Sequence, residues 1–199
     1  QVADVVYNLS FKIPNEKAKP IPSKLKVEFS INDLENDVFL DFNEEVSKLK
    51  SIKVNGETSE INHQKEHIIV DKTLLVLGEN SVEILFDAGE KSLNRNDEFL
   101  YTLLVPDRAS TLFPCFDQPD IKANYNLTVT APKGWQVLAG GLVDSSFEID
   151  GFIEYVFATS DLMSTYLFSF VAGKFTEENK NPGAFNMRFL YRENNQEKI

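Results

Sequence analysis

Apolar and polar residues alternate with a period of two along much of this chain. Every second residue from 5 to 13 is apolar, and the residues between them, such as Asn8 and Lys12, are mostly polar. Residues 25–31 repeat the pattern, with Lys26 and Glu28 among the polar positions. A strand with one face in the core and one in water produces this alternation, because successive side chains point to opposite faces. The pattern therefore predicts half-buried β-strands.

Short apolar runs of strand length continue along the rest of the chain. We expect strands at residues 38–42, 52–54, 68–70, 74–77, 82–86, 99–105, 125–131, 152–157, 166–172 and 185–191. Turn residues separate most of these runs, and no window of a dozen residues carries an apolar stripe at helical spacing. The predicted fold class is all-β: a single antiparallel, β-sandwich-like domain over residues 1–199.

The chain's two histidines form an H-x-x-E-H pattern at His63, Glu66 and His67, which is the inverted form of a zinc-protease signature. Such a motif binds metal from a helix, where residues four apart lie on one face. Here the flanking residues predict strands, and Asn55-Gly56 before them is a strong hairpin signal. We therefore interpret the segment as a polar hairpin turn and predict no metal site.

Composition excludes several other classes of site. A net charge of −11 argues against a nucleic-acid-binding surface, which needs clustered Lys and Arg. The single cysteine, Cys115, allows no internal disulfide, and its apolar neighbours predict a buried, inert thiol. No apolar run reaches the length of a membrane span. The chain begins with Gln1, which leaves both a cytoplasmic location and export after signal removal open.

Residues 105–122 form a long irregular stretch that mixes aromatic, proline and ionisable residues. It holds Asp107, Arg108 and Asp120 close to Phe113 and Phe116. Loops of this kind are candidates for function. The alternative is structural: the apolar residues close the end of the sandwich, and the prolines stiffen the loop. Composition does not decide between these two interpretations.

Two blocks of sequence resemble one known family. Residues 112–123 read LFPCFDQPDIKA and are followed by YNLTVTAPKGW at 125–135, while residues 162–175 read LMSTYLFSFVAGKF. These resemble the FPCFDEP and PMSTYL blocks of the aminopeptidase N family of zinc metallopeptidases, in the same order. The resemblance extends more weakly to both ends of the chain. It implies the all-β, saddle-shaped N-terminal domain that packs beside the catalytic domain of those enzymes.

The resemblance also implies that catalysis depends on residues outside this chain. The sequence contains neither G-A-M-E-N nor H-E-x-x-H, the motifs that bind the substrate amine and zinc in the family. We therefore expect no catalytic residue and no metal ligand in this chain, a catalytic domain after residue 199, and zinc and peptide substrates for the full-length protein. The alternative is a non-catalytic relative, or a stand-alone β-sandwich binding module.

One loop is expected to contribute to the substrate site. In the family, an acidic or amide residue before the FPCFDEP block helps bind the substrate's α-amino group. Here Val105 occupies that position, so either the missing domain holds the amine or Asp107 takes the role. The resemblance also predicts a cis bond at Val105-Pro106. Because an Asp side chain readily accepts hydrogen bonds from its own downstream backbone, we interpret Asp117-Gln118-Pro119 as a turn that fixes the loop. The substrate-binding candidates are Val105, Pro106 and Asp107, and the structural motif comprises Pro114, Cys115, Phe116, Asp117, Gln118 and Pro119.

Overall fold

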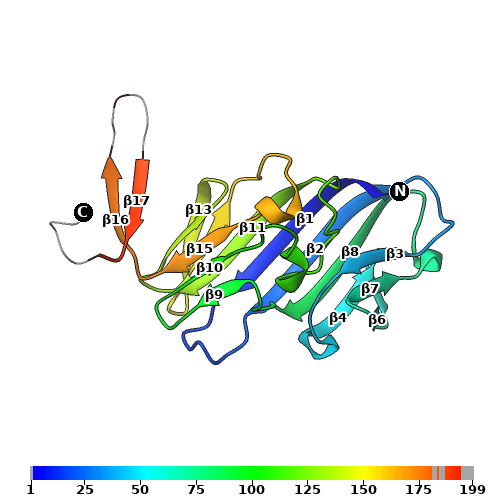
Figure 1. Ribbon diagram of the computed structural model, residues 1–199, viewed down its shortest axis with the longest axis horizontal. Helices are drawn as coiled ribbons and strands as arrows, with labels where there is room; N and C mark the ends of the chain where they lie inside the picture. The colour runs from blue at the N-terminus through cyan, green and yellow to red at the C-terminus, as the bar shows by residue number, and fades with distance from the viewer. Residues whose placement is uncertain (1, 181–182, 184–186, 194–199) are drawn as a thin grey trace.

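The computed structural model describes residues 2–180, 183 and 187–193, and these residues are almost entirely β-structure (Figure 1). The strands are β1 Val2–Lys12, β2 Pro22–Ile31, β3 Val38–Asp41, β4 Leu49–Val54, β5 Glu57–Ser59, β6 His63–Gln64, β7 His67–Val70, β8 Gly78–Asp87, β9 Leu93–Arg95, β10 Phe99–Thr102, β11 Ala123–Pro132, β12 Gln136–Ala139, β13 Val143–Ile149, β14 Phe152–Phe157, β15 Phe170–Gly173, β16 Thr176–Lys180 and β17 Met187–Tyr191. The helical turns are short 3-10 segments: η1 Val46–Lys48, η2 Lys72–Leu74, η3 Ala109–Thr111 and η4 Thr165–Leu167. None of these is long and apolar enough to cross a membrane. The all-β prediction is confirmed.

An eight-stranded sheet forms the frame of the molecule, in the order β13-β14-β11-β1-β2-β8-β4-β5. Adjacent strands in this sheet are antiparallel, with one exception. Strands β1 and β11 pair in parallel, from Val5↔Ala123 to Lys12↔Thr130. The N-terminal strand therefore joins the two halves of the sheet, although its partner lies more than a hundred residues later.

Two smaller sheets cover one face of this frame. The four-stranded sheet β12-β15-β10-β9 lies toward one end and the three-stranded sheet β3-β7-β6 toward the other (Figure 1). The alternating apolar residues of the large sheet point between the layers. The ring of Phe11 on β1 packs 5.2 Å from Phe170 on β15, and the ring of Phe86 on β8 packs 5.9 Å from Phe42, next to β3. The core is thus a sandwich of one large sheet and two small ones.

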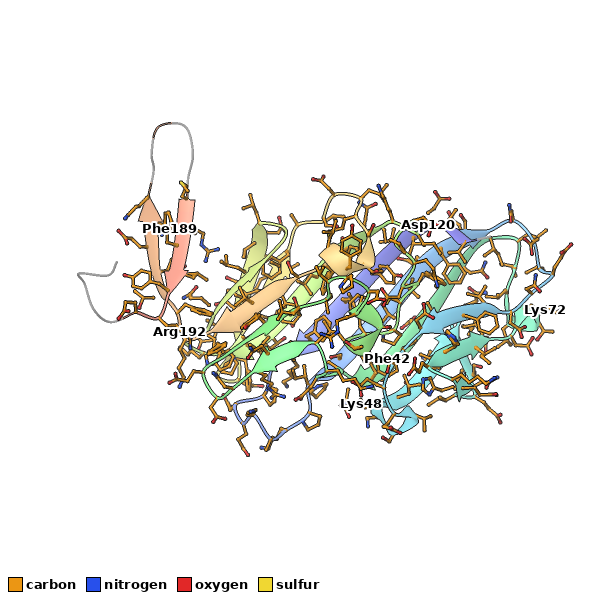
Figure 2. The ribbon with its side chains drawn as sticks, in the orientation of Figure 1. Phe42, Lys48, Lys72, Asp120, Phe189 and Arg192 are labelled. Atoms are coloured by element: carbon orange, nitrogen blue, oxygen red, sulfur yellow. The ribbon has the colours of Figure 1, made fainter. Side chains whose placement is uncertain are left out.

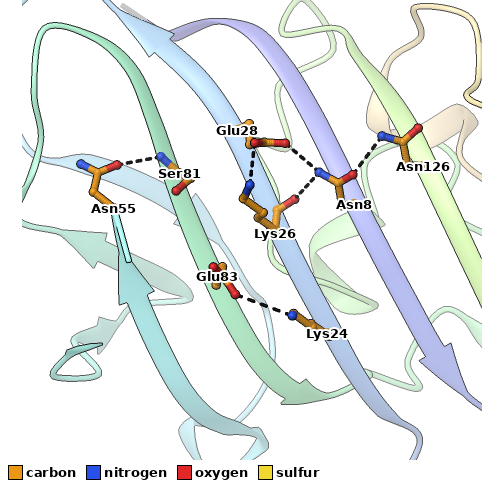
Figure 3. A network of polar contacts seen from close by, with 8 residues as sticks. All are labelled: Asn8, Lys24, Lys26, Glu28, Asn55, Ser81, Glu83 and Asn126. Atoms are coloured by element: carbon orange, nitrogen blue, oxygen red, sulfur yellow. Dashed lines mark hydrogen bonds and ion pairs between the residues drawn. The ribbon is translucent and has the colours of Figure 1, made fainter. Parts of the chain in front are cut away.

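The opposite face of the large sheet carries linked polar side chains (Figure 3). Asn126 on β11 donates to Asn8 on β1 at 2.9 Å, and Asn8 donates to Glu28 on β2 at 3.0 Å. Glu28 also forms an ion pair of 2.7 Å with Lys26. These are the polar positions of the alternation, and their side chains hydrogen-bond to one another across neighbouring strands.

The H-x-x-E-H pattern forms a hairpin, as the sequence predicts. His63 lies on β6 and His67 on β7, joined by Lys65 and Glu66 with φ of 49° and 69°. Two successive residues of positive φ make the tight turn whose twist matches paired strands. The Asn55-Gly56 turn between β4 and β5 has the same signature, with φ of 51° and 87°.

Some strand predictions are wrong or too long. Residues 74–77 form no strand, because the Asp71 side chain accepts the Thr73 N–H and starts η2, and the Asn80 side chain bonds both backbone groups of Val76. Residues 99–105 are a strand only to Thr102, and 166–172 begin as η4. Within the expected strand 185–191, Phe185 and Asn186 lie outside the described residues.

The hairpin β16–β17 stands away from the layered body (Figure 1). Glu177 and Arg188 form a two-pronged ion pair across it, with N···O distances of 3.1 and 2.9 Å. At its base, the Arg192 guanidinium lies 3.9 Å from the centre of the Phe99 ring, a cation–π contact with β10 (Figure 2). The hairpin is therefore attached to the four-stranded sheet through its base.

Candidate functional site

The irregular stretch predicted at residues 105–122 lies between the two small sheets. Backbone hydrogen bonds of 2.7 and 3.0 Å pair Cys115 with Asp41 at the end of β3, which ties the stretch to the three-stranded sheet. Two residues before the stretch, the Leu103 N–H donates to the Ser92 carbonyl at 2.8 Å, next to β9. The stretch thus bridges the gap in the layer that covers the large sheet.

Residues 103–108, which begin two residues before this stretch and include its first four residues, form what we call the tip; Leu104 is buried, and the other five residues are exposed. Leu103 and Val105 are 57% and 66% exposed, and Pro106, Asp107 and Arg108 are also exposed. The Val105-Pro106 bond is cis, which confirms the expectation from the resemblance. Within the described part of the chain, the Asp107 carboxylate has no hydrogen bond or ion pair. The three substrate-binding candidates are therefore adjacent and open to a partner.

The second part, residues 109–116, is buried. Phe113 makes edge-to-face contacts with Tyr7 at 6.0 Å and with Phe168 at 5.2 Å between ring centres. Pro114, Cys115 and Phe116 are buried as well. The structural interpretation, in which apolar residues of the loop close the end of the sandwich, thus holds for residues 109–116. The ionisable residues of the tip lie at the surface.

Cys115 is the buried, inert thiol that the sequence predicts. Burial raises the pKa of the thiol well above its usual value, and the nearby carboxylates of Asp117 and Asp41 raise that pKa further. A thiolate is needed for nucleophilic attack or metal binding. Cys115 is therefore a core residue.

Asp117 fixes the stretch, but not through the contact that the sequence predicts. Its carboxylate accepts the Ser110 N–H at 3.0 Å and the Thr165 hydroxyl at 2.8 Å, so it binds upstream backbone and a distant loop instead of its own downstream backbone. The turn lies about one residue later than predicted: it spans residues 118–121 and is closed by the hydrogen bond of 3.1 Å from the Ile121 N–H to the Gln118 carbonyl. Pro119 contributes its carbonyl, which accepts the Ser164 hydroxyl at 2.6 Å. Asp117 thus connects η3, which follows the tip, to the loop around η4.

Two contacts of this region have no signal in the sequence. Asp41 and Thr165 lie far from the motif in the chain, yet both bind Asp117: Asp41 accepts its backbone N–H at 2.9 Å, and Thr165 donates to its carboxylate. Asp41 is a polar position within the predicted strand 38–42, and Thr165 lies in the second block that resembles the family, but neither position indicates a contact with Asp117. An alternation pattern gives the face of a residue but not its partner in another sheet.

The histidine hairpin does not fit zinc. The imidazole of His63 contacts the Phe42 carbonyl at 2.9 Å, and that of His67 contacts the Asp41 carboxylate at 2.7 Å, so the two rings are engaged by separate protein groups. Among residues 2–180, 183 and 187–193, no three His, Cys, Asp or Glu side chains gather in a group that could hold a metal ion.

The sequence of this chain is similar to one known domain family and to several aminopeptidases. The family model of the Peptidase M1 N-terminal domain matches residues 4–167. Leucyl aminopeptidase of Saccharolobus solfataricus is 30% identical over 137 residues, which is 65% of this chain and 17% of that protein. Probable aminopeptidase 1 of Sulfurisphaera tokodaii is 28% identical over 177 residues, 73% of this chain and 22% of its own length.

A solved structure agrees at the level of the fold. The M1 zinc metallopeptidase from Deinococcus radiodurans superposes with a TM-score of 0.73 at 14% identity, covering 94% of this chain and 46% of that chain. This chain therefore spans about a fifth of the length of the two archaeal relatives and under half of the compared structure. The order of its sheets, the loop between them and the family match lead to one conclusion: the chain belongs to the Peptidase M1 N-terminal domain family.

Proposed function

We propose that this chain is the N-terminal domain of a zinc aminopeptidase that removes N-terminal residues from peptides. The observation that carries the proposal is the tip, a cis-proline loop with a free carboxylate, raised above a rigid buried motif. Exposed polar groups on a rigid support are typical of a binding element. The names of the related aminopeptidases support the same assignment. The residues that bind zinc would belong to a catalytic domain beyond these 199 residues.

Exposed apolar side chains support a partner domain on the same side. Leu103 and Val105 of the tip are exposed, and so are Leu162 and Leu167 beside η4, at 61% and 52%. The hydrogen bonds of Asp117 and Pro119 to Thr165 and Ser164 hold the η4 loop against the stretch that bears the tip. Several exposed apolar residues on neighbouring loops are typical of a protein interface. We assign this side to the enzyme's own catalytic domain.

The proposal is tested by expressing the full-length gene product beside the 199-residue chain. We expect the full-length protein to bind about one zinc ion per molecule and to release a chromogenic amine from amino-acid amides. The 199-residue chain should do neither. A full-length protein that contains no zinc and is inactive would instead support the non-catalytic relative or the stand-alone binding module.

The free carboxylate of the tip suits an ammonium group, so we assign the amine-binding role to Asp107. Because this contact has the same strength in the ground and transition states, Asp107→Asn should raise KM about tenfold and leave kcat nearly unchanged. Adding Val105→Glu to that variant should recover much of the loss, because it restores a carboxylate two residues away. Steady-state kinetics of the full-length protein measures both effects.

Asp144→Asn is the matched control, since Asp144 is an exposed aspartate on the edge strand β13. It should leave KM unchanged. If Asp107→Asn and Asp144→Asn behave alike, the amine is held entirely by the catalytic domain and the assignment to Asp107 is wrong.

A further inference from the structure

We propose that Asp41, oriented by His67, is the positioning residue that holds the tip in place for the substrate's amine end. The inference rests on the function proposed above for the tip. It gives a role to the H-x-x-E-H hairpin, which neither a metal site nor the family motif explains.

Asp41 contacts the structural motif of residues 114–119 through both its backbone and its side chain. Its backbone N–H and carbonyl pair with Cys115 at 2.7 and 3.0 Å. Its carboxylate oxygen Oδ2 accepts the backbone N–H of Asp117 at 2.9 Å and the amide Nε2 of Gln118 at 3.2 Å. The Asp41 side chain is 16% exposed. Hydrogen bonds to a carboxylate that is largely shielded from water are stronger than those between neutral groups.

The restraint passes from Asp41 to the tip through Asp117. Asp41 fixes the backbone of Asp117, and the Asp117 carboxylate in turn accepts the Ser110 N–H at 3.0 Å. Ser110 lies three residues after Asp107, in the 3-10 segment η3, which starts directly after the tip. The orientation of η3 sets the direction in which the chain leaves the tip. A shift of the Asp117 backbone would therefore displace Asp107.

His67 determines which way the Asp41 carboxylate faces. Its ring nitrogen Nδ1 lies 2.7 Å from Asp41 Oδ1. An ionised carboxylate only accepts hydrogen bonds, so Nδ1 carries the proton in this contact, whether the imidazole is neutral or charged. The ring also packs edge-to-face on Phe39, at 6.0 Å between ring centres. With Oδ1 engaged by His67, Oδ2 is turned toward Asp117 and Gln118.

His63 provides a matched control in the same hairpin. It lies four residues before His67, and its Nε2 contacts the Phe42 carbonyl at 2.9 Å. Removal of His63 weakens the hairpin without touching the Asp41 carboxylate. A general loss of stability and a specific loss of positioning can therefore be separated.

The test uses the full-length protein with His67→Ala, His67→Asn and His63→Ala. Asparagine places its Nδ2 donor close to the position of the imidazole Nδ1, so His67→Asn should keep the contact. We expect His67→Ala to raise KM for amino-acid amides about fivefold with kcat within twofold of wild type. His67→Asn and His63→Ala should stay within twofold of wild type in both constants.

Amide hydrogen exchange of the peptide covering residues 105–117 is the second measurement. His67→Ala should speed exchange there, because Ser110 and Asp117 lose part of their protection, while His63→Ala should not. Unchanged exchange together with unchanged KM in His67→Ala overturns the inference. If the wild-type enzyme is inactive, the proposed function fails, and faster exchange only in His67→Ala still supports the restraint by Asp41.

Discussion

Gly89→Ala is expected to destabilise the domain by at least about 3 kcal/mol. A Cβ on Gly89 would lie 1.8 Å from the backbone oxygen of Thr111 and 2.8 Å from the Glu44 carboxylate. The backbone at Gly89 cannot move away from Thr111 freely, because the Gly89 N–H donates to the carbonyl of the next residue, Leu112, at 2.9 Å. Thr111 and Leu112 belong to the buried half of the candidate site. The glycine therefore allows the segment after β8 to lie directly against the candidate loop of residues 105–122.

Urea unfolding of this chain and its variant measures the effect. Gly140→Ala is the control, since no atom lies within 4 Å of its added Cβ and its φ is not positive. We expect that control to stay within about 1 kcal/mol of wild type. Equal free energies of unfolding for the two variants would show that the contact at Gly89 relaxes without cost.

Tyr7→Phe and Tyr125→Phe are expected to have opposite consequences for stability. The two rings stack at 5.0 Å in the core, and burial raises the pKa of both hydroxyls. The Tyr7 hydroxyl accepts the buried N–H of Phe116 at 2.9 Å, in the middle of the family motif. The Tyr125 hydroxyl has no hydrogen-bond partner among the described residues. The Tyr7 oxygen satisfies a buried hydrogen-bond donor. The Tyr125 oxygen is removed from water without gaining a hydrogen bond in exchange.

Removing the Tyr7 oxygen should cost about 1–3 kcal/mol, because the Phe116 N–H is left unsatisfied. Removing the Tyr125 oxygen should leave the free energy of unfolding unchanged or raise it slightly. Urea denaturation midpoints compare the two variants directly, since each loses a single atom from neighbouring rings. A loss of similar size in both would mean that the Tyr125 hydroxyl is bonded in solution, for example by a buried water.

The strands that the sequence predicts best are those with one wet face. In β2, in β1 from Val5 and in β11 up to Ala131, the alternation matches the order of buried and less buried positions, because one face of each strand packs in the core. The short strands β5, β9 and β12 are missed because they lie at sheet edges. At an edge, a few backbone hydrogen bonds define the strand, and its residues show little alternation of apolar and polar side chains.

The candidate site was predictable in part. The aromatic and ionisable residues of 105–122 and the resemblance together locate the loop and its cis bond. The contacts that hold the loop were not predictable, because Asp41 at the end of β3 and Thr165 in η4 reach Asp117 across 76 and 48 residues of chain. Pairings of this kind depend on how layers stack, which no local pattern encodes.

The parallel pairing of β1 with β11 has a consequence for folding during synthesis. Strands β1, β2, β8, β4 and β5 are neighbours in the sheet and come from the first 59 residues and residues 78–87. They can pair before the rest of the chain is made. Until Ala123–Pro132 leaves the ribosome, one edge of β1 stays unpaired, and Tyr7 lacks the Tyr125 ring that stacks on it. Non-local pairing of this kind slows folding and prolongs the aggregation-prone stage, so a nascent chain whose residues 123–132 have not yet left the ribosome should bind holding chaperones.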